Sequence, residues 1–175
     1  MIKIAANKHS YDSKNKRNKK DVKYIVIHNT GNRGDTAENN ANYFKNVNTR
    51  EAGAHFFIDQ NGVIIKSVDL NRVAWAVGGG KYADCNKTGG GKLYRIACNA
   101  NSVSIELCDI MNKQPSDKMI KSVAETVKYI QKYCPNAKDI IRHFDVNGKH
   151  CPERMMEDED WKEFQFKVLK EYLKK

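Results

Sequence analysis

The sequence has no long apolar run. None of its 175 residues lie in a stretch that approaches the ~20 apolar residues of a membrane span. The first ten residues, MIKIAANKHS, also lack the apolar core of a secretion signal. We therefore expect a soluble protein that is made in the cytoplasm without a signal peptide and has no membrane partner. If it acts outside the cell, another factor must release it.

Paired cysteine motifs are also missing. The five cysteines form no C-x-x-C pair and no short regular spacing. Their odd number favours reduced thiols in a protein made in a reducing compartment. A bridge between Cys85 and Cys98 across a loop is the less favoured alternative.

No phosphate cradle is present, although residues 78–100 contain two glycine triplets. The chain has neither G-x-G-x-x-G at a strand-to-helix turn nor G-K-[ST]. A segment of more than about 15 residues without secondary structure inside a compact domain usually has a function or is mobile. We therefore expect residues 78–100 to form a functional or mobile loop.

Positive charge exceeds negative charge, with a formal net charge of +10. Seven Lys/Arg and one Asp in residues 1–20 contribute +6 of that excess. The net positive charge is consistent with an anionic partner such as nucleic acid, an anionic membrane surface or an anionic cell wall, but a basic N-terminal arm such as residues 1–20 is a weaker signal than a basic stripe along a folded face. A nucleic-acid binder ranks last among these functions, because the charge lies mainly in the arm and no nucleic-acid motif is present.

The hydrophobic pattern predicts one α/β domain over residues 1–175, without a linker or repeat. Strands are expected at 23–28, 54–58, 63–68, 102–108 and 139–143. Helices are expected at 37–46, 116–133 and 161–173, with Thr36 or Asp35 capping the first and Ser116 the second.

Three residues are ligand types that zinc prefers. His28 ends the apolar run YIVIH, His143 ends a later strand, and Cys151 follows the turn signal Asn147-Gly148. Each one alone favours a structural role, because buried histidines and free cysteines are common. As a set they predict a zinc ion, and three protein ligands with one open position are typical of a catalytic site.

Two charged residues are candidates for catalysis beside that ion. Glu106 lies in the strand SVSIELC, where it either points to water or reaches the cleft as a general base. Lys149 lies two residues before Cys151 and either stabilises an oxyanion or is an ordinary surface lysine. His150 is an alternative to His143 as a ligand, but neighbours in an extended loop point in opposite directions.

Four further residues are candidates for substrate binding. His55 precedes an apolar strand, so a structural and a substrate-lining role are equally supported. Trp75 more often belongs to a core than to a binding platform. Together with Tyr82 and Tyr94 it would line a groove for a sugar or peptide.

The motifs IVIHNTG, AHFFIDQNG, NANSVSIELC and RHFDVNGKHCP occur in this order. Over residues 22–155 the chain resembles the zinc-dependent N-acetylmuramoyl-L-alanine amidases, which share the fold of peptidoglycan recognition proteins. The resemblance implies a central mixed sheet flanked by helices, with zinc in an open groove. It implies that His28, His143 and Cys151 bind the zinc and that Glu106 and Lys149 assist catalysis.

The resemblance also implies a substrate and a place of action. The expected reaction cuts the amide bond between N-acetylmuramic acid and L-alanine in peptidoglycan of Gram-positive walls. A catalytic domain of a phage endolysin or a bacterial autolysin is expected, as a monomer without a wall-binding module. Two alternatives stay open: a peptidoglycan-binding module without catalysis, against which Cys151 argues, and a zinc peptidase that cuts within the stem peptide.

Overall fold

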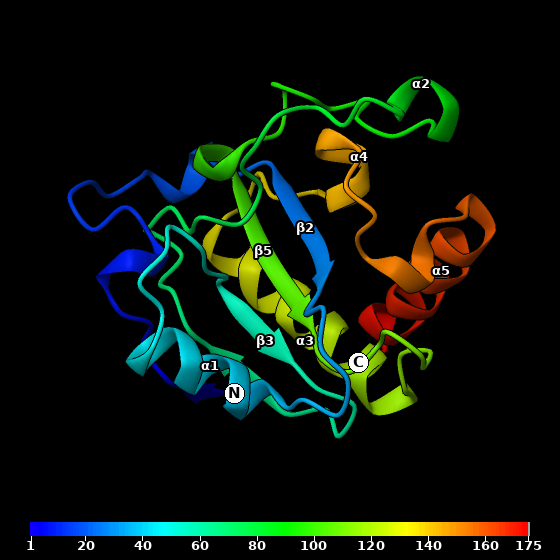
Figure 1. Ribbon diagram of the computed structural model, residues 1–175. Helices are drawn as coiled ribbons and strands as arrows, with labels where there is room; N and C mark the ends of the chain where they lie inside the picture. The colour runs from blue at the N-terminus through cyan, green and yellow to red at the C-terminus, as the bar shows by residue number, and fades with distance from the viewer. Residues whose placement is uncertain (175) are drawn as a thin grey trace.

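A mixed β-sheet forms the centre of the computed structural model, which describes residues 1–174 (Figure 1). Its strand order is β1-β4-β3-β5-β2-β6. The strands are β1 (Ile2–Lys3), β2 (Tyr24–Asn29), β3 (Phe56–Ile58), β4 (Ile64–Lys66), β5 (Ser102–Leu107) and β6 (Asp139–Arg142). The α-helices are α1 (Ala37–Asn46), α2 (Cys85–Thr88), α3 (Asp117–Tyr133), α4 (His143–Asn147) and α5 (Asp158–Leu173).

Parallel pairing dominates the sheet. Strand β2 lies between β5 and β6 and runs parallel to both, while β3 and β4 form the antiparallel hairpin that the sequence predicts. Strand β3 also pairs in parallel with β5, and β1 with β4. This combination confirms the expected α/β class with a mixed sheet.

The two faces of the sheet carry different helices (Figure 1). Ile25 and Ile27 face the main core, which α3 and α5 cover. The side chain of Val26 points to the opposite face, because side chains alternate along a strand. It packs with Val146 of α4. Phe57 on that second face packs against α1. The second face therefore has α1 and α4 on either side of the ends of β2 and β5.

Two predicted helix starts are confirmed by their caps. The hydroxyl oxygen of Thr36 accepts a hydrogen bond from the Asn39 N–H, and that of Ser116 accepts one from the Met119 N–H, each at 3.1 Å. The last helix begins at Asp158, before the predicted start at 161, because acidic residues fill its first turn. Negative charges there are stabilised by the helix dipole, a signal that the apolar pattern alone does not contain.

The strand predicted over 139–143 ends at Arg142, so the expectation that His143 ends a strand is wrong. His143 is instead the first residue of α4, which the sequence reading did not predict. This helix has only five residues, too few to produce a helical period. Its last residue is Asn147, and the capping residue that follows, Gly148, has a left-handed φ of 86°.

The basic N-terminal arm is part of the folded domain. Its first residues form β1, which pairs with β4. Arg17 donates hydrogen bonds to the backbone oxygens of Leu70 and Ser102 at 3.0 and 2.6 Å.

All five cysteines are free in the structure, and the reducing compartment stays a prediction. Among residues 1–174, no helix has the length and apolar character needed to cross a bilayer.

Candidate metal centre

The register of two central strands and the turn into α4 bring the predicted site residues together. His28 of β2 lies directly opposite Glu106 of β5, so their side chains share one face of the sheet. His143 enters from the start of α4, at the end of the neighbouring strand β6. Cys151 follows the turn after α4, where its backbone oxygen accepts a hydrogen bond from the Phe144 N–H at 2.8 Å.

The three predicted ligands form one compact cluster. One ligand atom from each of His28, His143 and Cys151 lies within 4.8 Å of the other two. The two imidazole rings meet edge to face, with centroids 4.5 Å apart. All three residues are buried, with 2%, 4% and 3% of their surface exposed. The four-coordinate geometry of zinc separates such atoms by roughly 3.5 Å, so small side-chain rotations would allow them to share one ion.

Several polar atoms of this cluster are buried and unpaired. His28 Nε2, His143 Nδ1, His143 Nε2 and Glu106 Oε2 have no hydrogen-bond partner among the described residues. An unsatisfied buried polar group costs about 1–3 kcal/mol, so four of them at one place need an explanation. A cation held by one nitrogen of each imidazole and by the thiolate would satisfy two of these four atoms, and these residue types fit zinc.

The electrostatic environment keeps both histidines neutral, which is the form that binds metal. Burial lowers the pKa of His28 well below its ordinary value, and the adjacent His143 and Lys149 lower it further. Burial also lowers the pKa of His143 to about 3, with a smaller contribution from Lys149. Both rings therefore offer free lone pairs at neutral pH.

Cys151 must lose a proton to become a ligand. Burial raises the pKa of its thiol to about 12, and the Glu106 carboxylate adds to this rise. The backbone N–H of Asn29 lies 3.4 Å from the sulfur and opposes the rise, because it stabilises the thiolate. Metal binding at this cysteine would therefore release a proton.

Glu106 borders the cluster and also reaches solvent. Its Oε1 lies 3.9 Å from His28 Nδ1, and 20% of its side chain is exposed. Burial raises the pKa of this carboxyl to about 7, while the positive charge of Lys149 lowers it and Asp35 raises it. A carboxyl poised near neutral pH can both accept and donate a proton.

Lys149 is exposed and adjoins the same cluster. Its positive charge influences the pKa values of His28, His143 and Glu106. His150 lies elsewhere, with Nε2 3.6 Å from a carboxylate oxygen of Asp84. Of these two residues, Lys149 is therefore the one whose charge acts on the candidate ligands.

Comparison with known proteins agrees with this geometry. Residues 18–154 match the family model described as N-acetylmuramoyl-L-alanine amidase. The chain belongs to this amidase family. The amidase CwlA of Bacillus subtilis (strain 168) is 32% identical over 145 residues, which cover 80% of this chain and 46% of CwlA. XlyB of the same organism is 30% identical over 86% of this chain and 43% of its own length.

Solved structures extend the likeness to the whole fold. The structure of PlyL is 26% identical and superposes with a TM-score of 0.71, covering 96% of both chains. The PlyG catalytic domain is 24% identical, has the same TM-score, and covers 98% of this chain and 94% of its own. The chain spans less than half the length of the curated relatives CwlA and XlyB.

In this member of the amidase family, the glycine-rich segment 78–100 is tied to α4. The N–H groups of Tyr82, Gly91 and Leu93 donate to backbone oxygens of residues 147, 144 and 145, at 2.8–2.9 Å. The Asn147 side chain donates in return to the Gly78 oxygen at 3.0 Å. The segment therefore supports the helix that begins with His143 and leads to Lys149 and Cys151.

The four residues predicted to bind substrate contact different parts of the chain. Tyr82 is exposed, and its backbone N–H bonds to the last residue of α4. Trp75 is half-buried and bonds through its backbone to residues 10 and 53. The Tyr94 ring lies 5.5 Å from the Arg95 guanidinium. A substrate role for these three stays a prediction.

His55 lies in the interior, with 1% of its surface exposed. Its Nδ1 accepts a hydrogen bond from the Ser104 N–H at 3.1 Å, and its Nε2 lies 3.1 Å from the Arg72 backbone oxygen. Both ring nitrogens are therefore used by protein groups. These contacts support the structural role, which was one of the two alternatives for this residue.

Arg142 is a supporting residue that sequence reasoning missed. It is 4% exposed, and its guanidinium bonds to the carboxylates of Asp145 and Asp158 at 2.8 and 3.0 Å. It also donates to the backbone oxygens of Met155 and Met156. Arg142 therefore joins α4 to the chain that follows Cys151. The acidic residue three positions after Arg142 was the available signal.

Proposed function

We propose that this domain hydrolyses the amide bond between N-acetylmuramic acid and L-alanine in peptidoglycan, using zinc held by His28, His143 and Cys151. The observation that carries the proposal is the buried convergence of these three ligands beside Glu106. Membership of the amidase family supports the reaction type. Peptidoglycan as substrate makes the bacterial cell wall the proposed place of action.

The three proposed ligands suit a catalytic ion. Zinc bound there would polarise the scissile carbonyl and lower the pKa of water to about 7. The neutral imidazoles of His28 and His143 and the thiolate of Cys151 would leave a fourth position for water or substrate. The Asn29 N–H directed at the Cys151 sulfur holds the thiolate in place.

Glu106 has the position and the acidity of a proton carrier. Its carboxylate takes a proton from the attacking water and passes it to the nitrogen of the leaving L-alanine. The pKa of about 7 makes both transfers accessible near neutral pH. Its unpaired Oε2 is free for this exchange.

Lys149 supplies the positive charge for the transition state. Negative charge develops on the scissile carbonyl oxygen when water attacks. An ammonium group beside the centre stabilises that oxygen. This stabilisation is largest when the negative charge on the oxygen is fully formed. Its reach is supported by its effect on the pKa values of the surrounding groups.

The decisive experiment is mass spectrometry of the soluble products released from purified Gram-positive peptidoglycan. We expect stem peptides that begin with L-alanine, and we expect a zinc chelator to abolish them. Cys151→Ser should lose zinc and activity together. Glu106→Gln should retain zinc and lose roughly 10²–10⁴-fold in rate, the usual size of an acid–base contribution.

Other product patterns would contradict the proposal. Shorter peptides would indicate a peptidase that cuts within the stem. Protein retained on the wall without any products would indicate a binding module. Full activity of a metal-free Cys151→Ser protein would remove zinc from the mechanism.

A further inference from the structure

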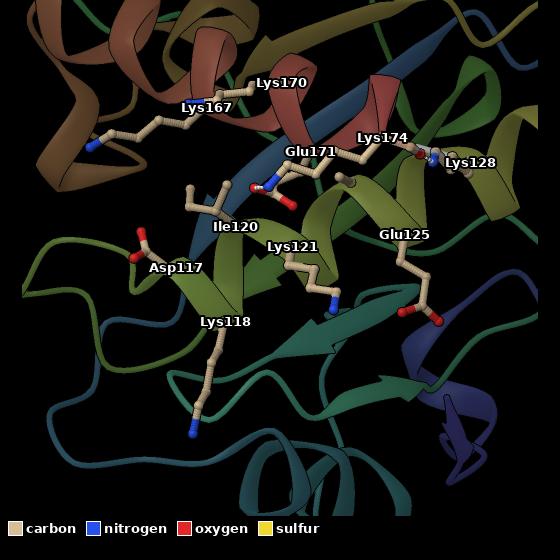
Figure 2. Close-up of a pocket in the computed structure, with 11 residues that line it drawn as sticks. Asp117, Lys118, Ile120, Lys121, Glu125, Lys128, Lys167, Lys170, Glu171 and Lys174 are labelled. Atoms are coloured by element: carbon tan, nitrogen blue, oxygen red, sulfur yellow. Dashed lines mark hydrogen bonds and ion pairs between the residues drawn. The ribbon is translucent and has the colours of Figure 1, made fainter.

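A lysine-rich groove lies between α3 and α5 (Figure 2). These two helices cover the sheet face opposite the metal centre. Its volume is about 880 Å³. Six lysines and three carboxylates line it, together with Ile120 and Ala124. The lysines are Lys118, Lys121, Lys128, Lys167, Lys170 and Lys174. The lining therefore has a net charge of +3, and none of its residues is aromatic.

Among the described residues, four of these six lysines have no carboxylate partner, and one of the four, Lys128, donates to the Lys174 backbone oxygen at 3.0 Å. Lys174 pairs with Glu171, and Lys167 pairs with Glu163 at 2.7 Å. Within residues 1–174, no carboxylate lies within 4.0 Å of the ammonium groups of Lys118, Lys121 and Lys170. These three cations are available to an external anion.

The lysines are arranged along both helices. Figure 2 shows Lys167 and Lys170 on α5, and Lys118 and Lys121 extending from α3 on the side away from α5. Residues three positions apart on a helix are separated by roughly 4.5 Å along its axis. The positive charges therefore repeat along each helix, at the rim and on the outer side of the groove, which suits a chain of repeated negative charges better than a single anion.

We propose that this groove binds a flexible polyanion with phosphodiester charges, specifically a polyol-phosphate polymer of the cell wall. Lysine holds phosphate as a point charge and tolerates a mobile partner. Single-stranded nucleic acid is disfavoured, because its binding relies on aromatic side chains that stack on bases, and the groove has none. The choice of a wall polymer rests on the proposed function, since peptidoglycan lies in the same wall.

The position of the groove gives this binding a purpose. Because α3 and α5 cover the opposite sheet face, a polymer held there leaves the metal centre open to peptidoglycan. Binding at the groove would keep the enzyme at the wall between successive cuts. The local concentration of substrate would rise without any new contact at the active site.

The test is a titration of the whole chain with soluble poly(glycerol phosphate) over a series of salt concentrations. The groove variant K118Q/K121Q/K170Q is compared with K8Q/K14Q/K16Q, which removes the same charge from the N-terminal arm. The Lys8, Lys14 and Lys16 side chains are exposed. Circular dichroism and the midpoint of thermal unfolding check that both variants fold.

We expect the groove variant to bind at least tenfold more weakly at low salt, and the arm variant to change less than twofold. The slope of log affinity against log salt should fall by about 2 in the groove variant, since each lost contact on a flexible polyanion removes about 0.7. K118R/K121R/K170R should bind like the original chain, because it preserves the charge.

Four results would overturn the proposal. The first two are equal weakening of polymer binding in both glutamine variants and no binding of the polymer by the original chain. The third is loss of polymer binding in the arginine variant. The fourth is tighter binding of the original chain to single-stranded DNA or to phosphatidylglycerol vesicles than to the polymer. Because the titration contains no peptidoglycan, its result is independent of whether the proposed hydrolysis occurs.

Discussion

His55 illustrates how single contacts fix a protonation state. Its Nδ1 accepts from the Ser104 N–H, and its Nε2 lies 3.1 Å from the Arg72 backbone oxygen. The Arg17 guanidinium lies 3.0 Å from the same Nε2. A second ring proton would break the bond from Ser104 and add a charge beside Arg17. Burial, with Arg17, accordingly lowers the pKa of His55 to about 3.

This pKa predicts a loss of stability in acid. Between pH 6.5 and 3 the unfolded chain holds a proton on His55 that the folded chain does not. The free energy of unfolding therefore falls as pH falls, by up to about 1.4 kcal/mol per pH unit from this residue, and is fully recovered above pH 6.5. His55→Asn preserves an acceptor for Ser104 and removes that proton.

Urea unfolding between pH 4 and 6.5 measures the effect. The slope of the free energy against pH should be smaller in His55→Asn by nearly one proton, while His28 and His143 contribute equally to both proteins. Parallel slopes would show that His55 does not titrate in this range.

Arg17 is the residue that attaches the N-terminal arm. Besides Leu70 and Ser102, its guanidinium reaches the backbone oxygens of Asn99 and Ala100 at 3.1 and 3.2 Å. Arg17→Ala removes this donor from four backbone oxygens, three of them in part-buried bonds, so we expect a loss of roughly 2–4 kcal/mol in the free energy of unfolding. The exposed neighbour Lys16 offers a control, and Lys16→Ala should change stability by less than about 0.5 kcal/mol. Similar midpoints for the two variants in urea would refute an anchoring role.

At the scale of elements, the position of α4 depends on Gly148, the residue that caps its C-terminal end. Gly148 has a φ of 86°, and a Cβ there would lie 2.2 Å from the Cys85 sulfur. Gly148→Ala should therefore cost roughly 1–3 kcal/mol in stability. It should also weaken zinc binding, because α4 begins with His143 and leads to Cys151. A competition titration with a zinc indicator measures the second effect.

Gly80 provides the matched control for that substitution. A Cβ at Gly80 would meet no atom within 4 Å, and its φ is not left-handed. Gly80→Ala should leave zinc affinity unchanged and alter stability by less than about 0.5 kcal/mol. Equal zinc affinity in Gly148→Ala would show that the turn after α4 does not position the ligands.

The longer elements were predictable because each has a local signal. Thr36 and Ser116 cap helices with clear periods, and the β-branched run before His28 forms the central strand. The attachment of segment 78–100 to α4 has no such signal. It depends on backbone bonds such as the one from Tyr82 to Asn147, between residues 65 positions apart. Backbone groups are the same at every residue, so composition cannot reveal their partners.

At the scale of the whole molecule, charge shows the same contrast. The net charge of +6 in residues 1–20 is visible in the sequence as a cluster of lysines and one arginine. The groove lysines are spread over residues 118–174 and alternate with acidic residues, so each stretch resembles an ordinary solvated helix face. Only the packing of α5 beside α3 brings them together. The candidate ligands could be proposed despite their separation, because His28, His143 and Cys151 together form a set of zinc-ligand types, although each one alone favours a structural role.

The metal centre should also contribute to the stability of the whole fold. Four buried polar atoms lack partners there, and the unfolded chain has no preformed site, so an ion that binds only the folded protein stabilises it. With free zinc at 1,000 times its dissociation constant, the gain is about 4 kcal/mol. For a chain of this length that corresponds to roughly 10 °C in the midpoint of thermal unfolding.

Calorimetry with zinc and with a chelator should show this difference in the original chain. In Cys151→Ser the two midpoints should nearly coincide, because one of three ligands is lost. Equal midpoints in the original chain would mean that its buried histidines are satisfied without a metal.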